Sequence, residues 1–261
     1  MRTPFPLEYA PRGLVGLLVP PANTTVEAEA SLLLPPGIGW VAARLVGDAK
    51  GTVPERMRQY LEALDATLAQ VNNAPVCAYA LAVTGASYYC GAATEDAMVA
   101  RLEERLGVPF ITAARAVRDA LLALGARRLG LVSPYPDDVT EASVAYWESR
   151  GFTVVRVARV PLPEDAFHPI YALGSREATL ALEGLDATGV DAVVLLGTGM
   201  PTLASIARHP SHGGVPVISS MLALGWRVAE ALLRPEAPSA ATLRACIEGE
   251  GWKAHLGTRL A

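Results

Sequence analysis

The sequence predicts an α/β protein of two pseudo-symmetric lobes, each built on a parallel sheet, and two observations carry this prediction. Apolar strand-like runs alternate with helical patterns along the chain, and such alternation is typical of a parallel sheet with helices on both faces. One strand–helix unit also occurs twice, as an internal repeat. We therefore expect one lobe over residues 1–112 and a second over 113–220, with a C-terminal helix over 221–261 packing back on the first lobe.

The elements of the first lobe follow from local patterns. Apolar runs at 13–19, 40–46 and 76–83 predict three strands. The segment 55–71 predicts a helix, because its apolar residues recur at spacings of three and four. A further helix is predicted over 95–106, so strands and helices alternate throughout this lobe.

The repeat is visible as aligned segments that share one offset. GLLVPPANTTVEAE from Gly16 aligns with GLVSPYPDDVTEAS from Gly130, an offset of 114 residues. ALAVTGAS from Ala80 aligns with VLLGTGMP from Val194 at the same offset of 114. A third pair, VPFIT and VPVIS, has an offset of 107, so the second copy is about seven residues shorter at that point. Chance similarity between apolar strands explains such agreement poorly, and a duplication explains it directly.

Composition sets the broad class of the protein. The 261 residues are 51% hydrophobic, which predicts a folded globular chain, and the net charge of −4 argues against nucleic-acid binding. The three cysteines show no metal-ligand spacing, which suits a reducing compartment. The N-terminus lacks a signal-peptide pattern, and no apolar run approaches the roughly 20 residues of a membrane helix. We expect a cytoplasmic protein without metal, nucleic-acid or membrane partners; the sequence leaves a homo-oligomer open.

Four loops are candidates for ligand binding, because open parallel sheets bind ligands beyond the carboxyl ends of their strands. They are 20–25, 83–87, 133–137 and 197–200. If the lobes are related by a pseudo-two-fold axis, these loops meet across one cleft. Two of them carry Thr-Gly pairs at equivalent repeat positions, and a hydroxyl beside backbone N–H groups suits a small anion. The glycine would let a ligand approach the backbone closely.

Several of these residues also have a purely structural interpretation. Asn23 and Thr24, and likewise Asp137 and Asp138, are suitable helix N-caps. Tyr135 could serve packing alone. The repeat-equivalent acids near the helix starts, Glu27 and Glu141, are favourable partners of a helix dipole. The four histidines lie outside the four loops and are expected at the surface: His168, His209, His212 and His255.

At these loops the sequence resembles the aspartate/glutamate racemase superfamily, in particular its branch of arylmalonate decarboxylases and maleate cis-trans isomerases. VGLLVPPANTTVEAE resembles the opening strand and loop of the maleate isomerases. VTGASYYCGAA and the following LGVPFITAARAVRDALLALGARRLGLVSPYPDDVTE resemble the middle of arylmalonate decarboxylase, and DAVVLLGTGMPTL resembles the second-lobe loop of both. The resemblance covers most of residues 13–225 and implies a racemase-like fold with its active site between the lobes.

The resemblance also implies a cofactor-independent chemistry, in which hydroxyls and backbone N–H groups bind a small carboxylate and stabilise an enediolate. Thr84 matches the oxyanion-binding threonine, Tyr135 the site tyrosine, and Asn23 the substrate-binding asparagine of the isomerases. Gly85 stands where a serine is common. The candidate catalytic residues are thus Thr84, Tyr135 and Thr198, and the candidate substrate-binding residues are Pro21, Asn23, Val83, Gly85, Gly197 and Gly199.

The sequence departs from the family at its two cysteine positions. Racemases and maleate isomerases carry one cysteine in each lobe, and the decarboxylase keeps the second as its proton donor. Here these positions are Val83 and Gly197. Two-base racemisation and covalent addition to maleate therefore lack their thiols, whereas decarboxylation depends more on the anion hole. Cys90 is a spare thiol or an unreactive packing residue.

Together these observations predict a lyase that decarboxylates a small malonate-like acid, with a proton supplied by Tyr135, Thr198 or water. One alternative is an isomerase that uses non-standard residues such as Cys90. Another is a protein that binds a carboxylate without turning it over.

Overall fold

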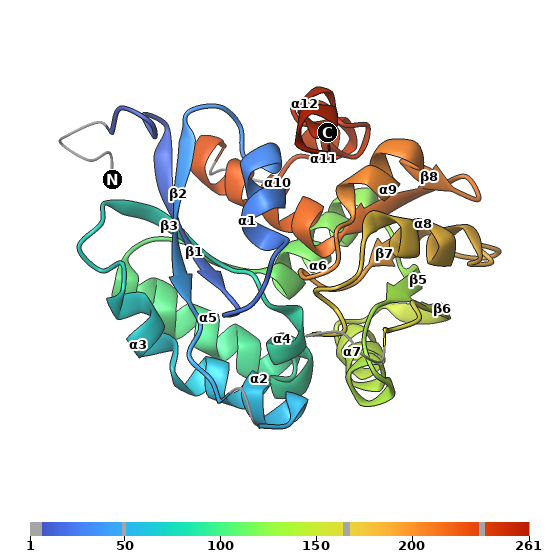
Figure 1. The fold of residues 1–261 in the computed structure, drawn as a ribbon, viewed down its shortest axis with the longest axis horizontal. Helices are drawn as coiled ribbons and strands as arrows, with labels where there is room; N and C mark the ends of the chain where they lie inside the picture. Colours follow the sequence, from blue (N-terminus) through green and yellow to red (C-terminus); the bar gives the residue numbers. More distant parts are fainter. Residues whose placement is uncertain (1–6, 49–50, 164–167, 235–237, 261) are drawn as a thin grey trace.

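The computed structural model describes residues 7–48, 51–163, 168–234 and 238–260 and places two sheets side by side (Figure 1). The first sheet has the strand order β2-β1-β3-β4, and the second has the order β6-β5-β7-β9-β8. The strands of the two sheets are β1 (Gly13–Val19), β2 (Ile38–Arg44), β3 (Val76–Leu81), β4 (Phe110–Thr112), β5 (Arg128–Ser133), β6 (Thr153–Arg159), β7 (Ala192–Leu195), β8 (Ser211–His212) and β9 (Val215–Ser219). All pairings are parallel except that of β8 with β9, so the carboxyl ends of the parallel strands in each sheet share one edge.

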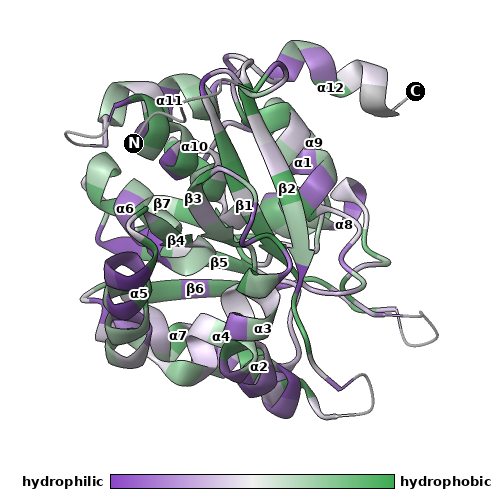
Figure 2. Ribbon diagram, turned by 90° about the vertical axis from the view of Figure 1, so that its left-hand side faces the viewer, coloured by the Kyte–Doolittle hydropathy of each residue, from purple (hydrophilic) through white to green (hydrophobic). Residues whose placement is uncertain are grey.

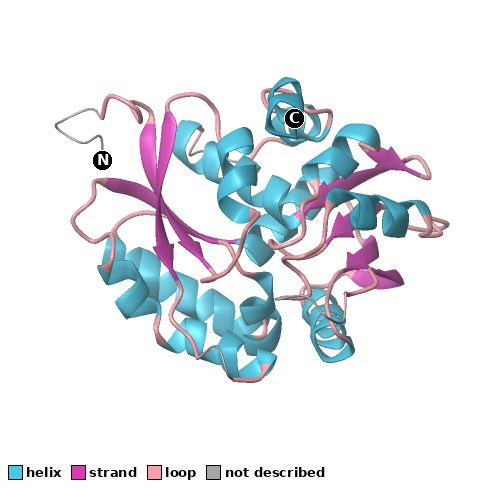
Figure 3. Ribbon diagram, in the orientation of Figure 1, coloured by secondary structure: helices cyan, strands magenta, loops and turns pink. Residues whose placement is uncertain are grey.

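Helices cover both sheets and fill the space between them (Figure 3). They are α1 (Val26–Leu33), α2 (Val53–Glu62), α3 (Leu64–Ala69), α4 (Thr84–Cys90), α5 (Ala92–Leu106), α6 (Ala113–Leu124), α7 (Asp137–Ser149), α8 (Ser175–Glu183), α9 (Leu203–Arg208), α10 (Ser220–Leu233), α11 (Ala240–Ile247) and α12 (Lys253–Leu260). Strands β1 and β7 consist of apolar and glycine residues that are mostly buried, as expected for strands covered on both faces. Hydrophobic residues gather along the strands, whereas α2 and α5 carry hydrophilic residues outward (Figure 2).

Two repeat-equivalent residues start the helices that lie between the sheets. Thr112 at the end of β4 accepts a hydrogen bond from Arg115 N (3.1 Å) and caps α6. Ser219 at the end of β9 accepts one from Leu222 N (3.1 Å) and caps α10. The two helices pack against each other, and α10 also packs on α1 and β3 of the first lobe. The chain therefore returns from the second lobe to the first.

The predicted fold class is confirmed, with two local differences. The helix expected over 55–71 breaks at Ala63, whose backbone (φ −92°, ψ 12°) leaves the helical range, giving α2 and α3. This break lets Leu64 and Leu68 pack into the core beside Tyr60. The single helix expected over 221–261 is instead three helices, α10, α11 and α12. The glycines at 249 and 251 adopt positive φ and separate α11 from α12.

No helix in the described part of the chain combines the length and the apolar character that crossing a bilayer requires.

Candidate active site

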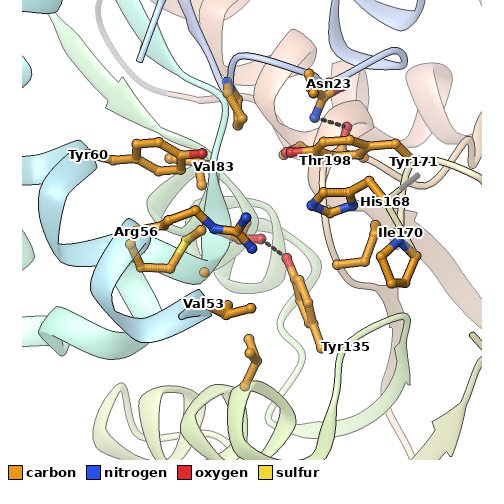
Figure 4. Close-up of a pocket in the computed structure, with 18 of the residues that line it drawn as sticks. Asn23, Val53, Arg56, Tyr60, Val83, Tyr135, His168, Ile170, Tyr171 and Thr198 are labelled. Atoms are coloured by element: carbon orange, nitrogen blue, oxygen red, sulfur yellow. Dashed lines mark hydrogen bonds between the residues drawn. The ribbon is translucent and has the colours of Figure 1, made fainter. Parts of the chain in front are cut away.

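A cavity of about 340 Å³ lies between the lobes, where loops from both sheets meet (Figure 4). The loops after β1, β3, β5 and β7 all contribute to it, as the sequence predicted from their positions at strand ends. Three further segments contribute to the wall: Gly47 after β2, the first turn and middle of α2, and residues 162 and 168–171 between β6 and α8. The duplicated lobes therefore enclose one shared site.

The polar centre of the cavity is a pair of hydroxyl groups, one from each lobe. Thr84 Oγ1 and the Tyr135 phenol oxygen lie 2.5 Å apart in a hydrogen bond. Burial raises the pKa of Tyr135 to about 12, while the Thr84 hydroxyl partly opposes this shift. The phenol therefore stays protonated at neutral pH and is available as a donor. The ring of Tyr135 is held edge-on by Tyr88, with 6.2 Å between ring centroids.

Asn23 combines the two interpretations that the sequence allowed. Its Oδ1 accepts hydrogen bonds from Thr25 N (2.9 Å) and Val26 N (3.0 Å), so it caps the start of α1. Its Nδ2 donates to the Thr198 carbonyl oxygen (3.3 Å) in the other lobe, and the residue lines the cavity.

The two aspartates proposed as caps of α7 do not cap it, since the helix begins at Asp137 after Pro136. Their carboxylates accept from Arg159 and from the Tyr89 hydroxyl.

The second Thr-Gly loop is used differently from the first. Thr198 lines the cavity, but its hydroxyl donates to the Ala82 carbonyl oxygen of the first lobe (2.8 Å). Thr25 Oγ1 donates to the Gly199 carbonyl oxygen (2.7 Å), a second bond between lobes. A Cβ on Gly199 would lie 2.5 Å from the ring of Tyr171, so the missing side chain makes room for this ring.

The two family cysteine positions also differ in their geometry. Val83 lines the cavity in an extended conformation (φ −145°, ψ 116°) that other residues adopt readily. Gly197 has φ +87° and is not among the lining residues, which is the one difference from the predicted site. A Cβ at residue 197 would lie 3.1 Å from Pro134 Cγ and 3.3 Å from the Tyr135 phenol oxygen. Tyr135 thus fills the space that a side chain at residue 197 would need.

Sequence reasoning missed one wall of the cavity. Val53, Arg56, Met57 and Tyr60 reach it from α2, whose amphipathic pattern indicated core packing and gave no sign of a site. The side chain of Arg56 extends into the cavity in Figure 4.

The prediction that all four histidines lie at the surface is wrong for His168. This residue lines the cavity beside Tyr171, and the two rings stack with centroids 3.8 Å apart. Burial lowers the pKa of His168, and the positive charge of Arg56 lowers it further. His168 lies nine residues beyond the end of β6, so the strand-end rule did not place it near the cleft.

Cys90 lies outside the lining of the cavity. Its thiol contacts the carbonyl oxygens of Ser87 and Gly91, each at 3.6 Å. Burial, and secondly the Glu95 carboxylate, raise the pKa of this thiol to about 11. The group is therefore a neutral thiol at physiological pH, without the features of an activated cysteine.

Comparison with known proteins agrees with this architecture. Arylmalonate decarboxylase from Bordetella bronchiseptica is 30% identical over 223 residues, covering 84% of this chain and 90% of that protein. The structure of maleate isomerase Iso from Pseudomonas putida S16 superposes with a TM-score of 0.76 at 26% identity, covering 84% of this chain and 92% of that one. That of a Nocardia farcinica maleate cis-trans isomerase with a covalently bound succinylcysteine intermediate has a TM-score of 0.76 at 23% identity, with the same coverage of 84% and 92%.

A match to a protein family spans most of the chain. Residues 15–244 match the arylmalonate decarboxylase family. The relatives include both decarboxylases and maleate isomerases, so the match identifies a branch of enzymes and leaves the reaction open. The chain belongs to the arylmalonate decarboxylase family.

Proposed function

We propose that the protein is a cofactor-independent decarboxylase of a malonate-like acid, and that the Thr84–Tyr135 hydroxyl pair is its anion hole. The observation that carries this proposal is the placement of that pair in a cavity with no cysteine among its described lining residues. Much of the remaining wall is apolar: Val53, Met57, Val83, Val139, Leu162 and Ile170. Hydroxyl donors aimed at developing negative charge are most effective where water is excluded.

The reaction follows from how the two carboxylates of a malonate would divide between these surroundings. One carboxylate accepts hydrogen bonds from Thr84 and Tyr135, and the other lies against the apolar wall. The bond from the α-carbon to the second carboxylate breaks, CO₂ leaves, and the electron pair moves into the first carboxylate to give an enediolate. The α-carbon then takes a proton from water or from the Tyr135 phenol. The Thr198 hydroxyl is already committed to Ala82 and is the weaker candidate.

The isomerase alternative needs a thiol where the substrate binds. The Nocardia isomerase holds a succinylcysteine intermediate, in which a cysteine is bonded to the substrate carbon skeleton. In this chain Val83 and Gly197 occupy the two family positions, and Cys90 lies outside the cavity with its pKa raised to about 11. These features favour decarboxylation over isomerisation.

Proton NMR in D₂O with phenylmalonate, ethylmalonate and maleate tests the proposal. Decarboxylation should yield product with deuterium at the α-carbon. Thr84→Ala and Tyr135→Phe should each lower kcat about 10²–10³-fold, the usual effect of removing one oxyanion donor. Thr179→Ala is the matched control, because this buried hydroxyl bonds to Ser175 and Ser205 away from the cavity.

Two results would overturn the proposal. Fumarate formed from maleate, and lost in Cys90→Ala, would establish the isomerase instead. Stabilisation of the protein by these acids, without turnover of any of them, would indicate a carboxylate-binding protein.

A further inference from the structure

Arg56 is a cation on the cavity wall that has no ion-pair partner among the residues that the structure describes. It lies on α2, whose start is fixed by a capping box between Thr52 and Glu55. Its side chain is partly buried and lines the cavity, and among the residues that the structure describes it forms no hydrogen bond or ion pair. Arg58, on the same helix but not among the residues lining the cavity, pairs with Glu62 at 2.8 Å. A partly buried, unpaired guanidinium is unfavourable unless a ligand supplies the negative charge.

His168 is a second polar group on this wall without a described partner. Its Nδ1 is fully buried and has no hydrogen bond within the described part of the chain. Stacking on Tyr171 fixes the plane of the imidazole, so Nδ1 cannot turn away to find a partner. Arg56 and His168 reach the cavity from opposite walls, from α2 and from the loop before α8 (Figure 4).

Neither of these groups has a hydrogen bond to the Thr84–Tyr135 pair in the described part of the chain. The positive charge of Arg56 acts on His168, Tyr60 and Tyr171, which all line the cavity. The pKa of Tyr135 responds instead to burial and to Thr84. The cavity therefore offers a hydroxyl pair, suited to the reacting carboxylate, and, at Arg56 and His168, a cationic end.

The carboxylate that leaves as CO₂ is a poor ligand for this cationic end. An ion pair with Arg56 would stabilise the charge that the reaction removes, and so would oppose bond cleavage. Arg56 is better matched to an anionic group that the product retains.

We propose that Arg56 and His168 bind a carboxylate at the end of the substrate's side chain, so that the preferred substrate is a malonate whose substituent itself ends in a carboxylate. Such a substrate is a tricarboxylate, and its product after loss of CO₂ is a dicarboxylate. The guanidinium supplies charge and paired donors, and His168 supplies one N–H. A cavity of about 340 Å³ is large enough for an acid of this size. This inference rests on the proposed decarboxylase function for the reaction, but its binding component can be measured without turnover.

Isothermal titration with succinate and butyrate tests the binding directly, since the two four-carbon acids differ in the distal carboxylate. Wild type should bind succinate at least about tenfold more tightly, in line with a charge-assisted hydrogen bond. Arg56→Gln and His168→Gln should reduce this preference, and Arg56→Lys should restore part of it. Arg58→Gln, on the same helix but outside the cavity, should keep it. Equal binding of both acids by wild type, or an unchanged preference in Arg56→Gln, would overturn the inference.

Turnover separates this inference from the proposed function. Ethane-1,1,2-tricarboxylate gives succinate, and ethylmalonate gives butyrate. Relative to ethylmalonate, the KM for the tricarboxylate should rise about 10–100-fold in Arg56→Gln, with a smaller change in kcat. An Arg56-dependent preference for succinate without any decarboxylation would sustain the anion subsite and refute the decarboxylase. Decarboxylation of ethylmalonate without that preference would support the decarboxylase and refute the anion subsite.

Discussion

The two Thr-Gly loops occupy equivalent positions in the two lobes but have diverged in use. In the first lobe, the Thr84 hydroxyl faces the cavity and bonds to Tyr135. In the second, the Thr198 hydroxyl crosses to the Ala82 carbonyl oxygen of the first lobe. Of the two copies of this turn, one therefore presents its hydroxyl to the cavity and the other joins the lobes.

A second pair of equivalent residues has also diverged. Glu29 on α1 is buried and accepts hydrogen bonds from Thr202 N (2.6 Å) and Leu203 N (3.1 Å) across the lobe boundary. Its repeat equivalent, Ser143, donates to the Thr140 carbonyl oxygen within its own helix. In this pair the first-lobe residue crosses the lobe boundary, whereas among the two threonines the second-lobe residue does so.

The largest expected effect distinguishes the two threonines. Thr84→Ala should lower kcat/KM for a malonate about 10²–10³-fold, because an anion-hole donor is lost. Thr198→Ala should cost far less turnover but should lower the free energy of unfolding by about 1–3 kcal/mol, since the Ala82 carbonyl loses its donor. Steady-state kinetics and urea denaturation measure the two quantities. Equal kinetic losses in both variants would mean that the loops are not specialised.

The contact made by Glu29 should make stability depend on pH. Burial raises the pKa of this carboxyl from its usual 4.5 to about 7, while hydrogen bonds from Thr202 and Leu203 oppose the shift. Because the folded state binds this proton more tightly, the stabilisation is fully present below about pH 4.5 and is lost as the pH rises through about 7. The size of the change is on the order of 3 kcal/mol.

Glu29→Gln removes the titrating group at nearly constant shape. Its free energy of unfolding should vary less than that of wild type between these pH values, as measured by denaturation at a series of pH values. If the difference in free energy of unfolding between wild type and the variant stays constant with pH, Glu29 does not titrate in this range.

The two cysteine positions should respond unequally when a thiol is restored. Gly197→Cys should lower the free energy of unfolding by about 1–3 kcal/mol, because its φ of +87° is unfavourable for a side chain and the Cβ crowds Tyr135. Val83→Cys should be tolerated, since the backbone there is extended. Thermal denaturation of both variants tests this contrast. A stable Gly197→Cys with unchanged activity would show that Tyr135 can be displaced without loss.

The smallest expected effect lies at the cationic end of the cavity. Removing a neighbouring positive charge makes protonation easier, so Arg56→Gln should raise the pKa of His168 toward its ordinary value. Burial, the larger cause, remains in the variant, so the recovery should be partial. NMR titration of the imidazole, assigned with His168→Gln, measures the change. An unaltered pKa would place Arg56 too far away to share a ligand with His168.

Residues that follow strands could be predicted from the sequence, whereas residues brought together by the packing of the two lobes could not. Thr84 and Tyr135 could be predicted because they follow strands, and parallel strands deliver their carboxyl ends to a common edge. Arg56 and His168 could not, since one lies on a helix face and the other in a loop after an edge strand. Their proximity depends on how two lobes pack, which no local pattern contains. The positive φ of Gly197 is likewise a property of the folded turn.

The return of α10 to the first lobe has a consequence for how the chain could be divided. A cut in the turn between α6 and β5 would leave two fragments, each holding one complete sheet. The C-terminal fragment would still present α10 to α1, α6 and β3 of the other. We therefore expect that the two halves, expressed as separate polypeptides, retain the surfaces through which they could reassemble around the shared cavity.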